Sequence, residues 1–542
     1  MVTRTLALAA LVAVPSLAAQ EAFTRADTLR GSWDTPGRSW WDVTHYDLAV
    51  RVQPADSSIA GRNVITYRVL APGTELQVDL MAPLVIDSVV QDGRRLTVRR
   101  EGSAHFAAVG PQRPGDVRSV TVWYHGRPKV APRPPWDGGI SWRTDSLGRP
   151  WIVTTDQGVG ASIWWPNKDT QADEPDSQLV AITVPEPLQH VGAGRLVSRV
   201  ANADGTITWT WRVQNPINIY ARARSAWNCA HWSETYPGES GMLTLDYYPL
   251  DYNLEQARVT FLQVRTTMQC FEHWFGPYPF YADGFKLIEV PYNGMEHQGA
   301  VTYGNGYANG YRGRDGSGTG LGMLWDFIIV HEMAHEWWGN NLTTRDLADM
   351  WVHESFGNYA EALYTECLFG KEAGAQYAIG TRRGIRNERP VVPPHRGVNA
   401  QGSGDMYPKG GNMLHTIRQV VADDARWRRI LRGLQRDFRH QLVDGAQVQA
   451  YISGVAGIDL SKVFEQYLTT VDIPVLEYRW SGGRLEYRWT GVVAGFDMPV
   501  DVVLGDAAVR LLPTPEWQAI ATTATALVVD PDYYVTAREV GR

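Results

Sequence analysis

The spacing of the hydrophobic residues changes twice along this chain of 542 residues and divides it into three parts. From about residue 40 to 240, short runs rich in Val, Ile, Tyr and Trp, such as Tyr46 to Val52, are separated by Gly, Pro and Asp and predict strands. From Leu254 to about Leu468 the apolar residues recur at helical spacing, with one expected strand at Phe285 to Val290. After Pro474 the strand pattern returns. We therefore predict an α+β multidomain fold: an N-terminal antiparallel β domain, a mainly helical domain and a small C-terminal β domain.

The first residues have the pattern of a secretory signal peptide. Arg4 precedes an apolar run from Leu6 to Val14, and small residues follow up to Ala19. The apolar run is shorter than the roughly 18 residues needed to span a membrane, so we expect no stable membrane insertion. We expect residues 1–19 to be removed on export to a periplasm or to the outside of the cell. The rest of the chain is then divided into domains at 20–240, 241–472 and 473–542.

Charge and cysteine content narrow the chemistry. The chain carries 58 acidic and 51 basic residues, a formal net charge of −7, whereas a nucleic-acid-binding protein normally presents a basic surface. Its three cysteines, Cys229, Cys270 and Cys367, include no Cys-x-x-Cys pair and are too few for a disulfide framework. The sequence is compatible with one disulfide among them. We therefore expect no nucleic-acid partner, and any metal chemistry must use histidine and carboxylate side chains.

A candidate metal site lies in the helical part. His331 and His335 are four residues apart, which places both imidazoles on one face of a helix, and Glu332 stands beside the first as a candidate general base. Composition alone produces such a match in roughly one of a hundred chains of this length. A catalytic zinc needs three protein ligands and one open position, and Glu354, at the start of a second expected helix, is the candidate third ligand.

The alternative interpretation is that these histidines are ordinary core or surface residues and that Glu354 is a capping carboxylate. The agreement of spacing, helix context and polarity argues against it. His353 directly precedes Glu354 and points about 100° away around the helix, so we interpret it as a packing or hydrogen-bonding residue rather than a ligand.

These residues resemble the signature of the gluzincin zinc aminopeptidases, peptidase family M1. The family motif is His-Glu-x-x-His, eighteen further residues and Glu, which His331, Glu332, His335 and Glu354 match, and Trp338-Gly339-Asn340 matches the segment after the first helix. The resemblance implies a saddle-like N-terminal β domain, a thermolysin-like catalytic domain and one Zn²⁺ per chain. Many relatives carry a large helical C-terminal domain, whereas only about 70 residues follow the helical part here, so this chain resembles a compact form.

A further segment resembles the family's Gly-x-Met-Glu-Asn exopeptidase motif. Gly294, Met295 and Glu296 follow an expected strand, and His297 stands where the family usually has Asn. Such a glycine-bearing edge segment can pair its backbone with an extended peptide. The resemblance implies that Glu296 faces the free amine of the substrate, and this charge-assisted contact would reject blocked or internal ends. Met295 is then a candidate wall of the first specificity pocket.

Two more segments resemble family motifs. Tyr407 precedes Pro408-Lys409-Gly410-Gly411 and resembles the Tyr-x-Lys-Gly segment, whose tyrosine donates a hydrogen bond to an oxyanion; a neutral hydroxyl suits that work. Residues 157–175 are similar to the family's Gln…Ala-Arg…Phe-Pro…Asp-x-Pro stretch, in which Gln157 matches the glutamine that helps to bind the amino terminus. Ser162 replaces the usual Arg, which is a departure from the pattern.

Together these residues predict a zinc-dependent aminopeptidase that hydrolyses N-terminal residues from peptides with a free N-terminus. Two alternatives stay open: a zinc hydrolase of a non-peptide, epoxide-type substrate, and a non-catalytic scaffold that retains the fold. Side-chain preference, oligomeric state and the role of the C-terminal domain do not follow from the sequence. The roles are assigned as follows: His331, His335 and Glu354 for the metal, Glu332 and Tyr407 for catalysis, and Gly294, Met295, Glu296 and Gln157 for the substrate.

Overall fold

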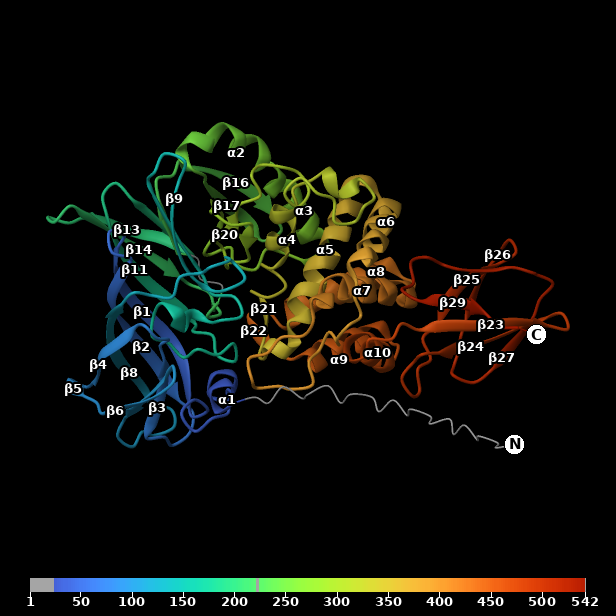
Figure 1. The fold of residues 1–542 in the computed structure, drawn as a ribbon, viewed down its shortest axis with the longest axis horizontal. Coiled ribbons are helices and arrows are strands. Elements are labelled where there is room, and N and C mark those ends of the chain that lie inside the picture. The colour runs from blue at the N-terminus through green and yellow to red at the C-terminus, as the bar shows by residue number, and fades with distance from the viewer. Residues whose placement is uncertain (1–23, 221–223, 542) are drawn as a thin grey trace, which may run out of the picture.

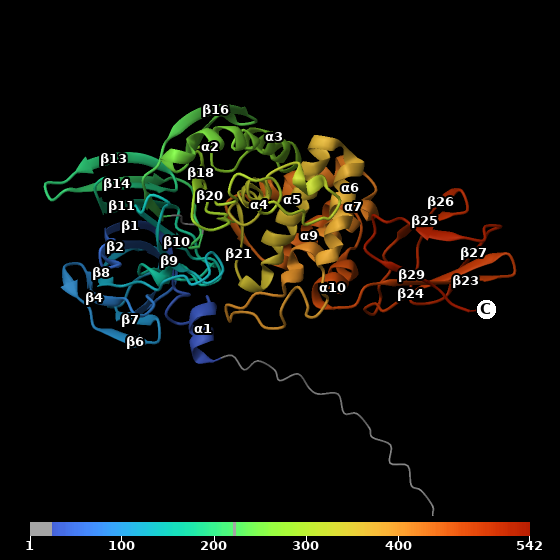
Figure 2. The ribbon, with the colours of Figure 1, turned by 45° about the horizontal axis from the view of Figure 1, so that its top comes forward.

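The computed structural model describes residues 24–220 and 224–541, and the structural statements below refer to these residues. The expected signal peptide at residues 1–19 lies outside them. The N-terminal strands, the helices and the C-terminal strands follow one another in space as they do in the sequence (Figure 1), and a second view shows the same order (Figure 2). The predicted α+β organisation is confirmed. No helix of this described part combines the length and the apolar composition that crossing a bilayer requires.

The N-terminal part is built from strands that alternate between buried and exposed residues, because each strand covers a core with one face. An eight-stranded sheet has the order β13-β14-β11-β1-β2-β8-β4-β5, and a four-stranded sheet, β12-β15-β10-β9, shares its hydrophobic core. The large sheet is antiparallel except for the pair β1–β11, whose long connection allows a parallel arrangement. The elements of the N-terminal part are α1 (Arg25–Gly31), β1 (Trp41–Gln53), β2 (Ser58–Val69), β3 (Glu75–Asp79), β4 (Val85–Gln91), β5 (Arg94–Arg95), β6 (Val98–Glu101), β7 (Ala104–Ala108), β8 (Val117–Gly126), β9 (Gly139–Thr144), β10 (Pro150–Thr155), η1 (Ala161–Ile163), β11 (Ser177–Pro185), β12 (Gln189–Gly192), β13 (Arg195–Ala201), β14 (Thr206–Val213) and β15 (Arg224–Trp227).

The middle part combines a five-stranded sheet, ordered β16-β17-β18-β20-β19, with a set of packed helices. The hairpin β16–β17 belongs to this sheet, so the structural division lies before Trp232 and the boundary placed at residues 240 and 241 falls inside a hairpin. The elements are β16 (Trp232–Gly238), β17 (Gly241–Tyr248), η2 (Asp251–Asn253), α2 (Leu254–Thr260), α3 (Gln263–Phe275), β18 (Phe285–Glu289), β19 (Gly294–Met295), β20 (Val301–Tyr303), η3 (Leu321–Met323), α4 (Phe327–Ala334), β21 (Leu342–Thr344), η4 (Leu347–Asp349), α5 (Trp351–Phe369), α6 (Lys371–Thr381), η5 (Arg382–Gly384), η6 (Gly404–Met406), α7 (Pro408–Val421), α8 (Asp424–Asp437), β22 (Gln441–Val443), α9 (Gly445–Ala456) and α10 (Ser461–Thr469).

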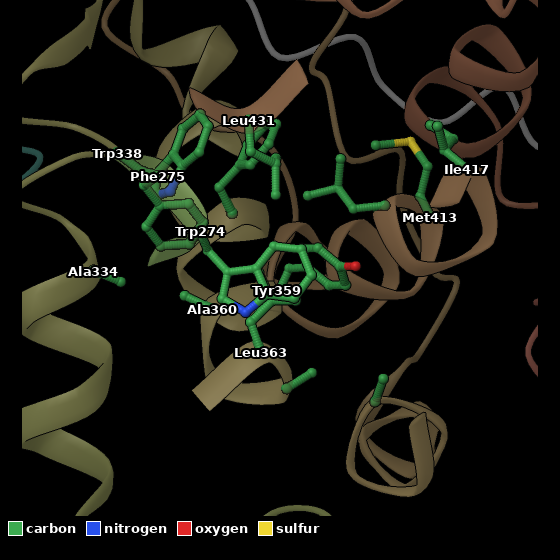
Figure 3. Close-up of a cluster of buried hydrophobic side chains, with 14 of the residues drawn as sticks. Trp274, Phe275, Ala334, Trp338, Tyr359, Ala360, Leu363, Met413, Ile417 and Leu431 are labelled. Carbon is green, nitrogen blue, oxygen red and sulfur yellow. The ribbon is translucent and has the colours of Figure 1, made fainter. Parts of the chain in front are cut away.

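One hydrophobic core joins these helices to the C-terminal strands. Trp274 of α3, Tyr359 and Leu363 of α5, and Leu431 of α8 gather around it (Figure 3). The same buried cluster continues into the two C-terminal sheets, ordered β27-β24-β23-β29 and β26-β25-β28. Those strands are β23 (Val475–Ser481), β24 (Arg484–Thr490), β25 (Val500–Leu504), β26 (Ala507–Leu511), β27 (Gln518–Ala521), β28 (Leu527–Val529) and β29 (Thr536–Glu539).

A disulfide between Cys270 and Cys367 ties α3 to α5, whereas Cys229 is buried and free. The bridge closes a loop with a sequence separation of 97. Because cross-linking so long a loop restricts the unfolded chain, we expect Cys270→Ser to lower the free energy of unfolding by about 3–5 kcal/mol. Urea unfolding with and without reductant measures this difference. Cys229→Ser is the control, and equal stability of the Cys270→Ser protein and the wild type would contradict the prediction.

Candidate metal centre and amine-binding site

Helix α4 carries the two histidines. Asp326 caps its first turn by accepting hydrogen bonds from the backbone N–H groups of Ile328 and Ile329 at 3.0 and 3.3 Å. His331 lies inside the helix and His335 is its C-terminal cap residue. Their Nε2 atoms are 3.3 Å apart, so both imidazoles point at one place, as their spacing predicts.

Glu354, in the first turn of α5, completes the group. Its Oε2 lies 3.3 Å from Nε2 of His335 and 3.7 Å from Nε2 of His331. Within the described ranges, these three buried residues are the one set of His, Cys, Asp or Glu side chains whose ligand atoms all lie within 4.8 Å of one another.

Hydrogen bonds behind each imidazole determine where its lone pair points. Nδ1 of His331 lies 2.8 Å from Oε1 of Glu361, and Nδ1 of His335 lies 2.8 Å from the carbonyl oxygen of Trp338. These oxygens accept hydrogen bonds, so each Nδ1 carries the proton and each Nε2 presents a lone pair to the centre.

The centre therefore fits a cation. Two imidazole lone pairs 3.3 Å apart repel one another, and the buried Oε2 of Glu354 beside them has no hydrogen-bond donor. A divalent ion between these atoms satisfies all three. Two nitrogens and one carboxylate oxygen are the donor set of Zn²⁺ in sites that leave a fourth position open.

Glu361, which orients His331, was not predicted from the sequence. Its other oxygen accepts hydrogen bonds from the hydroxyl of Tyr377 at 2.8 Å and from the amide of Asn358 at 3.2 Å. The available signal was its spacing: Glu361 follows Glu354 by seven residues, two turns along the same face of α5.

Removing this support should weaken metal binding. We expect Glu361→Ala to lower zinc affinity about 10–100-fold, because the imidazole of His331 loses the acceptor that fixes its orientation and basicity. Competition with a chromogenic chelator measures the dissociation constant. Glu366→Ala is the matched control, since Glu366 lies on the same helix but pairs with Arg418 at 2.6 Å. Equal affinities for the two variants would exclude this role.

The candidate amine-binding residues meet although they come from different parts of the chain. Nε2 of Gln157, which follows β10, donates to Oε1 of Glu296 at 2.8 Å. Asn340 donates its side-chain amide to the backbone carbonyl of Glu296 at 2.8 Å. Gly294 lies in β19 at the edge of the five-stranded sheet, and a Cβ there would lie 2.5 Å from Ile328, so glycine lets this edge pass close to α4.

Tyr407 reaches the metal ligands from the start of α7. Its hydroxyl donates to Oε1 of Glu354 at 2.7 Å, and its ring stacks on His331 with the centroids 5.9 Å apart. Helix α7 approaches α5 closely: a Cβ on Gly410 would lie only 1.9 Å from Oγ of Ser355, so only glycine fits there. The paired glycines after Tyr407 therefore serve this close contact between helices.

A cavity of about 180 Å³ connects these groups. Met295 does not line it: this side chain is 1% exposed and packs in the N-terminal hydrophobic core instead. The reason is the alternation of a strand, which turns Met295 away from the side where Glu296 lies. Three aromatic residues not predicted from the sequence, Trp136, Tyr311 and Phe327, contribute to the wall. The predicted residues in the lining are Gln157, Gly294, Glu296, His331, Glu332, His335, Glu354 and Tyr407.

The cavity concentrates carboxylates away from water. Burial, reinforced by the neighbouring Glu296 carboxylate and opposed by His331, raises the pKa of Glu332 to about 8. Burial also raises the pKa of Glu296 above its usual range. A nearby cation offsets this cost, so the acidic cavity suits a metal ion and a substrate ammonium group together.

His353 has a different role from its neighbour Glu354. Its Nε2 accepts a hydrogen bond from the backbone N–H of Thr344 at 3.0 Å, and its Nδ1 lies 3.2 Å from the hydroxyl of Tyr220. Burial lowers its pKa to about 3, so the ring is neutral. His353 therefore links α5 to Thr344 and Tyr220 by hydrogen bonds and is not a ligand of the candidate centre.

The fold and this site define a protein in which two histidines and one glutamate form a candidate zinc site beside an acidic cavity. Residues 260–467 match the family model of the peptidase family M1 domain, so this part of the chain is similar to that family.

Curated relatives match part of the chain. The probable aminopeptidase 1 of Sulfurisphaera tokodaii is 23% identical over 236 residues, which cover 41% of this chain and 29% of that protein. The leucyl aminopeptidase of Saccharolobus solfataricus is 24% identical over 245 residues, 43% of this chain and 31% of that protein. The chain thus spans about three tenths of the length of these curated relatives.

Solved structures share the fold over a longer stretch. A two-domain M1 zinc metallopeptidase bound to L-tryptophan has a TM-score of 0.70 at 19% identity and covers 82% of this chain and 98% of its own. An M1 zinc metallopeptidase from Deinococcus radiodurans has a TM-score of 0.67 at 20% identity, with the same coverage of 82% and 98%. At these identities the likeness supports the fold.

Proposed function

We propose that this chain is a zinc-dependent aminopeptidase that removes N-terminal residues from peptides. The observation that carries the proposal is that one cavity joins the three candidate metal ligands to Glu332 and to the Gln157–Glu296 pair. A metal-binding scaffold does not need the second set of groups. The names of the curated relatives, which are aminopeptidases, agree with it.

The residues of the chain divide the work. A Zn²⁺ ion held by His331, His335 and Glu354 supplies Lewis acidity and lowers the pKa of water. Glu332 accepts a proton from the attacking water and passes it to the amine that leaves when the peptide bond breaks. The Tyr407 hydroxyl donates a hydrogen bond to the carbonyl oxygen as negative charge develops there.

Glu296 and Gln157, which also line the cavity, orient the substrate. The Glu296 carboxylate binds the terminal ammonium group, and Gln157, which donates to that carboxylate, holds its orientation. The first peptide bond then lies next to Glu332. An acetylated terminus carries no charge, so it would leave the buried Glu296 carboxylate without a cation to balance it.

A panel of fluorogenic aminoacyl substrates, each with a free and an acetylated amine, tests the proposal together with elemental analysis. We expect one zinc per chain and hydrolysis of the free-amine substrates only. Equal hydrolysis of acetylated substrates would exclude aminopeptidase action. A zinc-free, inactive protein would support the scaffold, and turnover of an epoxide without turnover of peptides would support the non-peptide hydrolase.

We further propose that the protein is exported with loss of residues 1–19. The signal-like pattern of these residues supports this. The Cys270–Cys367 disulfide agrees with it, because disulfides persist in oxidising compartments. N-terminal sequencing of the mature protein tests the proposal, and an intact Met1 on the active protein would exclude it.

A further inference from the structure

The C-terminal β domain contacts α7, the helix that begins directly after Tyr407. Residues Asp530–Tyr534 of the connection between β28 and β29, which we call the 530–534 segment, lie against α7. Oδ1 of Asp532 is 3.1 Å from Nε2 of His415, and the backbone N–H of Tyr534 donates to Oγ1 of Thr416 at 2.9 Å. Both partners belong to α7, so the segment is fastened to the middle of that helix.

A first chain of hydrogen bonds runs from this segment to the residue after Tyr407. Arg382 donates to the backbone carbonyls of Pro531 and Asp532 at 2.8 and 3.2 Å, and through Nε to the side-chain oxygen of Asn412 at 2.6 Å. The amide of Asn412 in turn donates to the carbonyl of Pro408 at 2.9 Å. Arg382 is thus a half-buried link between the C-terminal domain and the first turn of α7.

A second chain of contacts ends on the segment that precedes Tyr407. The amide of Asn387 donates to the hydroxyl of Tyr534 at 3.2 Å. The backbone N–H groups of Arg386 and Asn387 donate to the carboxylate of Asp405 at 2.9 and 2.6 Å. Asp405 lies in η6, the short turn that leads directly into Tyr407.

Both chains of contacts begin on the 530–534 segment and end within two residues of Tyr407. An oxyanion donor must be held within roughly 0.5 Å of its productive place, and a misplacement of about 1 Å can cost about a hundredfold in rate. A loop such as the one before α7 cannot supply this precision alone, whereas two hydrogen-bonded supports, one before and one after Tyr407 in the sequence, can.

We infer that the C-terminal β domain is a positioning device for Tyr407, acting through Arg382 and through Tyr534. The inference rests on the proposed function, because it concerns the hydroxyl assigned to the oxyanion. It gives the small domain a role in catalysis that does not require it to touch the substrate. Arg382 and Tyr534 are positioning residues, and neither lines the cavity.

Steady-state kinetics of the full-length protein test the inference. We expect Arg382→Ala to lower kcat about tenfold and Tyr534→Phe, which removes only the hydroxyl, about threefold, each with little change in KM. In a Tyr407→Phe background the same substitutions should have no further effect on kcat, because the hydroxyl that they position is absent. Hydrogen exchange of the peptide spanning residues 404–412 should be at least about threefold faster in Arg382→Ala than in the wild type.

Arg510→Ala is the matched control. Arg510 also joins the C-terminal domain to α7, but at the far end, where it donates to the carbonyls of Gln419 and Val420 at 2.6 and 3.3 Å. It contacts the 530–534 segment through the hydroxyl of Tyr533 at 2.9 Å, which belongs to neither chain of contacts. We expect this variant to lose stability while it keeps wild-type kcat and wild-type exchange at residues 404–412. Unchanged kcat in both Arg382→Ala and Tyr534→Phe would overturn the inference, as would equal losses with and without the Tyr407 hydroxyl.

A failure of the proposed function has a different outcome. The wild type itself would then hydrolyse no aminoacyl substrate. In that case the exchange measurement still decides whether the C-terminal domain orders the Tyr407 segment: equal exchange in Arg382→Ala and the wild type would overturn the inference.

Discussion

Glu332→Gln should turn over aminoacyl p-nitroanilides at least about a thousandfold more slowly than the wild type while it still binds one zinc per chain. Glutamine keeps the size and the burial of the side chain but cannot accept the proton of the attacking water. Metal binding should persist, because His331, His335 and Glu354 supply the ligands and Glu332 is not one of them. The measurement is kcat/KM on metal-replete protein, with zinc content determined on the same sample.

Glu332→Asp provides the control for this prediction. Aspartate retains the base but shortens its reach by one methylene, so a part of the activity should return. A zinc-loaded Glu332→Gln protein with wild-type turnover would rule out the assignment of Glu332 as general base. Loss of zinc from that variant would instead show that the carboxylate contributes to metal binding.

The clustering of the three candidate metal ligands could be predicted because local spacing determines their geometry. His331 and His335 lie one turn apart, and the connection after α4, which contains β21 and η4, brings Glu354 back to them. The contact between Gln157 and Glu296 is different, because these residues are 139 positions apart. Only resemblance to a known family placed them together, since no local rule relates a loop of the N-terminal domain to an edge strand of another sheet.

Other features could not be predicted because several local choices satisfy the same pattern. A hairpin such as β16–β17 has the same alternation whichever sheet it joins, so the boundary at residue 240 did not separate the sheets. The sequence predicted Met295 in the cavity because it precedes Glu296, whereas in β19 its side chain points into the N-terminal hydrophobic core. The contacts of Arg382 with backbone carbonyls of the 530–534 segment leave no sequence signal, because any residue presents a carbonyl.

Glu296→Gln should raise KM for free-amine substrates about a hundredfold or more and should largely abolish the preference for free over acetylated amines. The carboxylate is 2% exposed, so a substrate ammonium group that enters this cavity loses its water and depends on that charge. Glutamine preserves the shape and can still contact Gln157, so the effect isolates the charge.

Paired substrates with free and acetylated amines give this ratio directly, and Gln157→Ala supplies a graded comparison. Gln157 orients the carboxylate but carries no charge, so its loss should cost only about tenfold and leave the preference for free amines in place. A Glu296→Gln protein that still selects free amines as strongly as the wild type would mean that another group recognises the terminus. We therefore expect the proposed exopeptidase action to depend on the charge of Glu296 and not on the narrowness of the cavity.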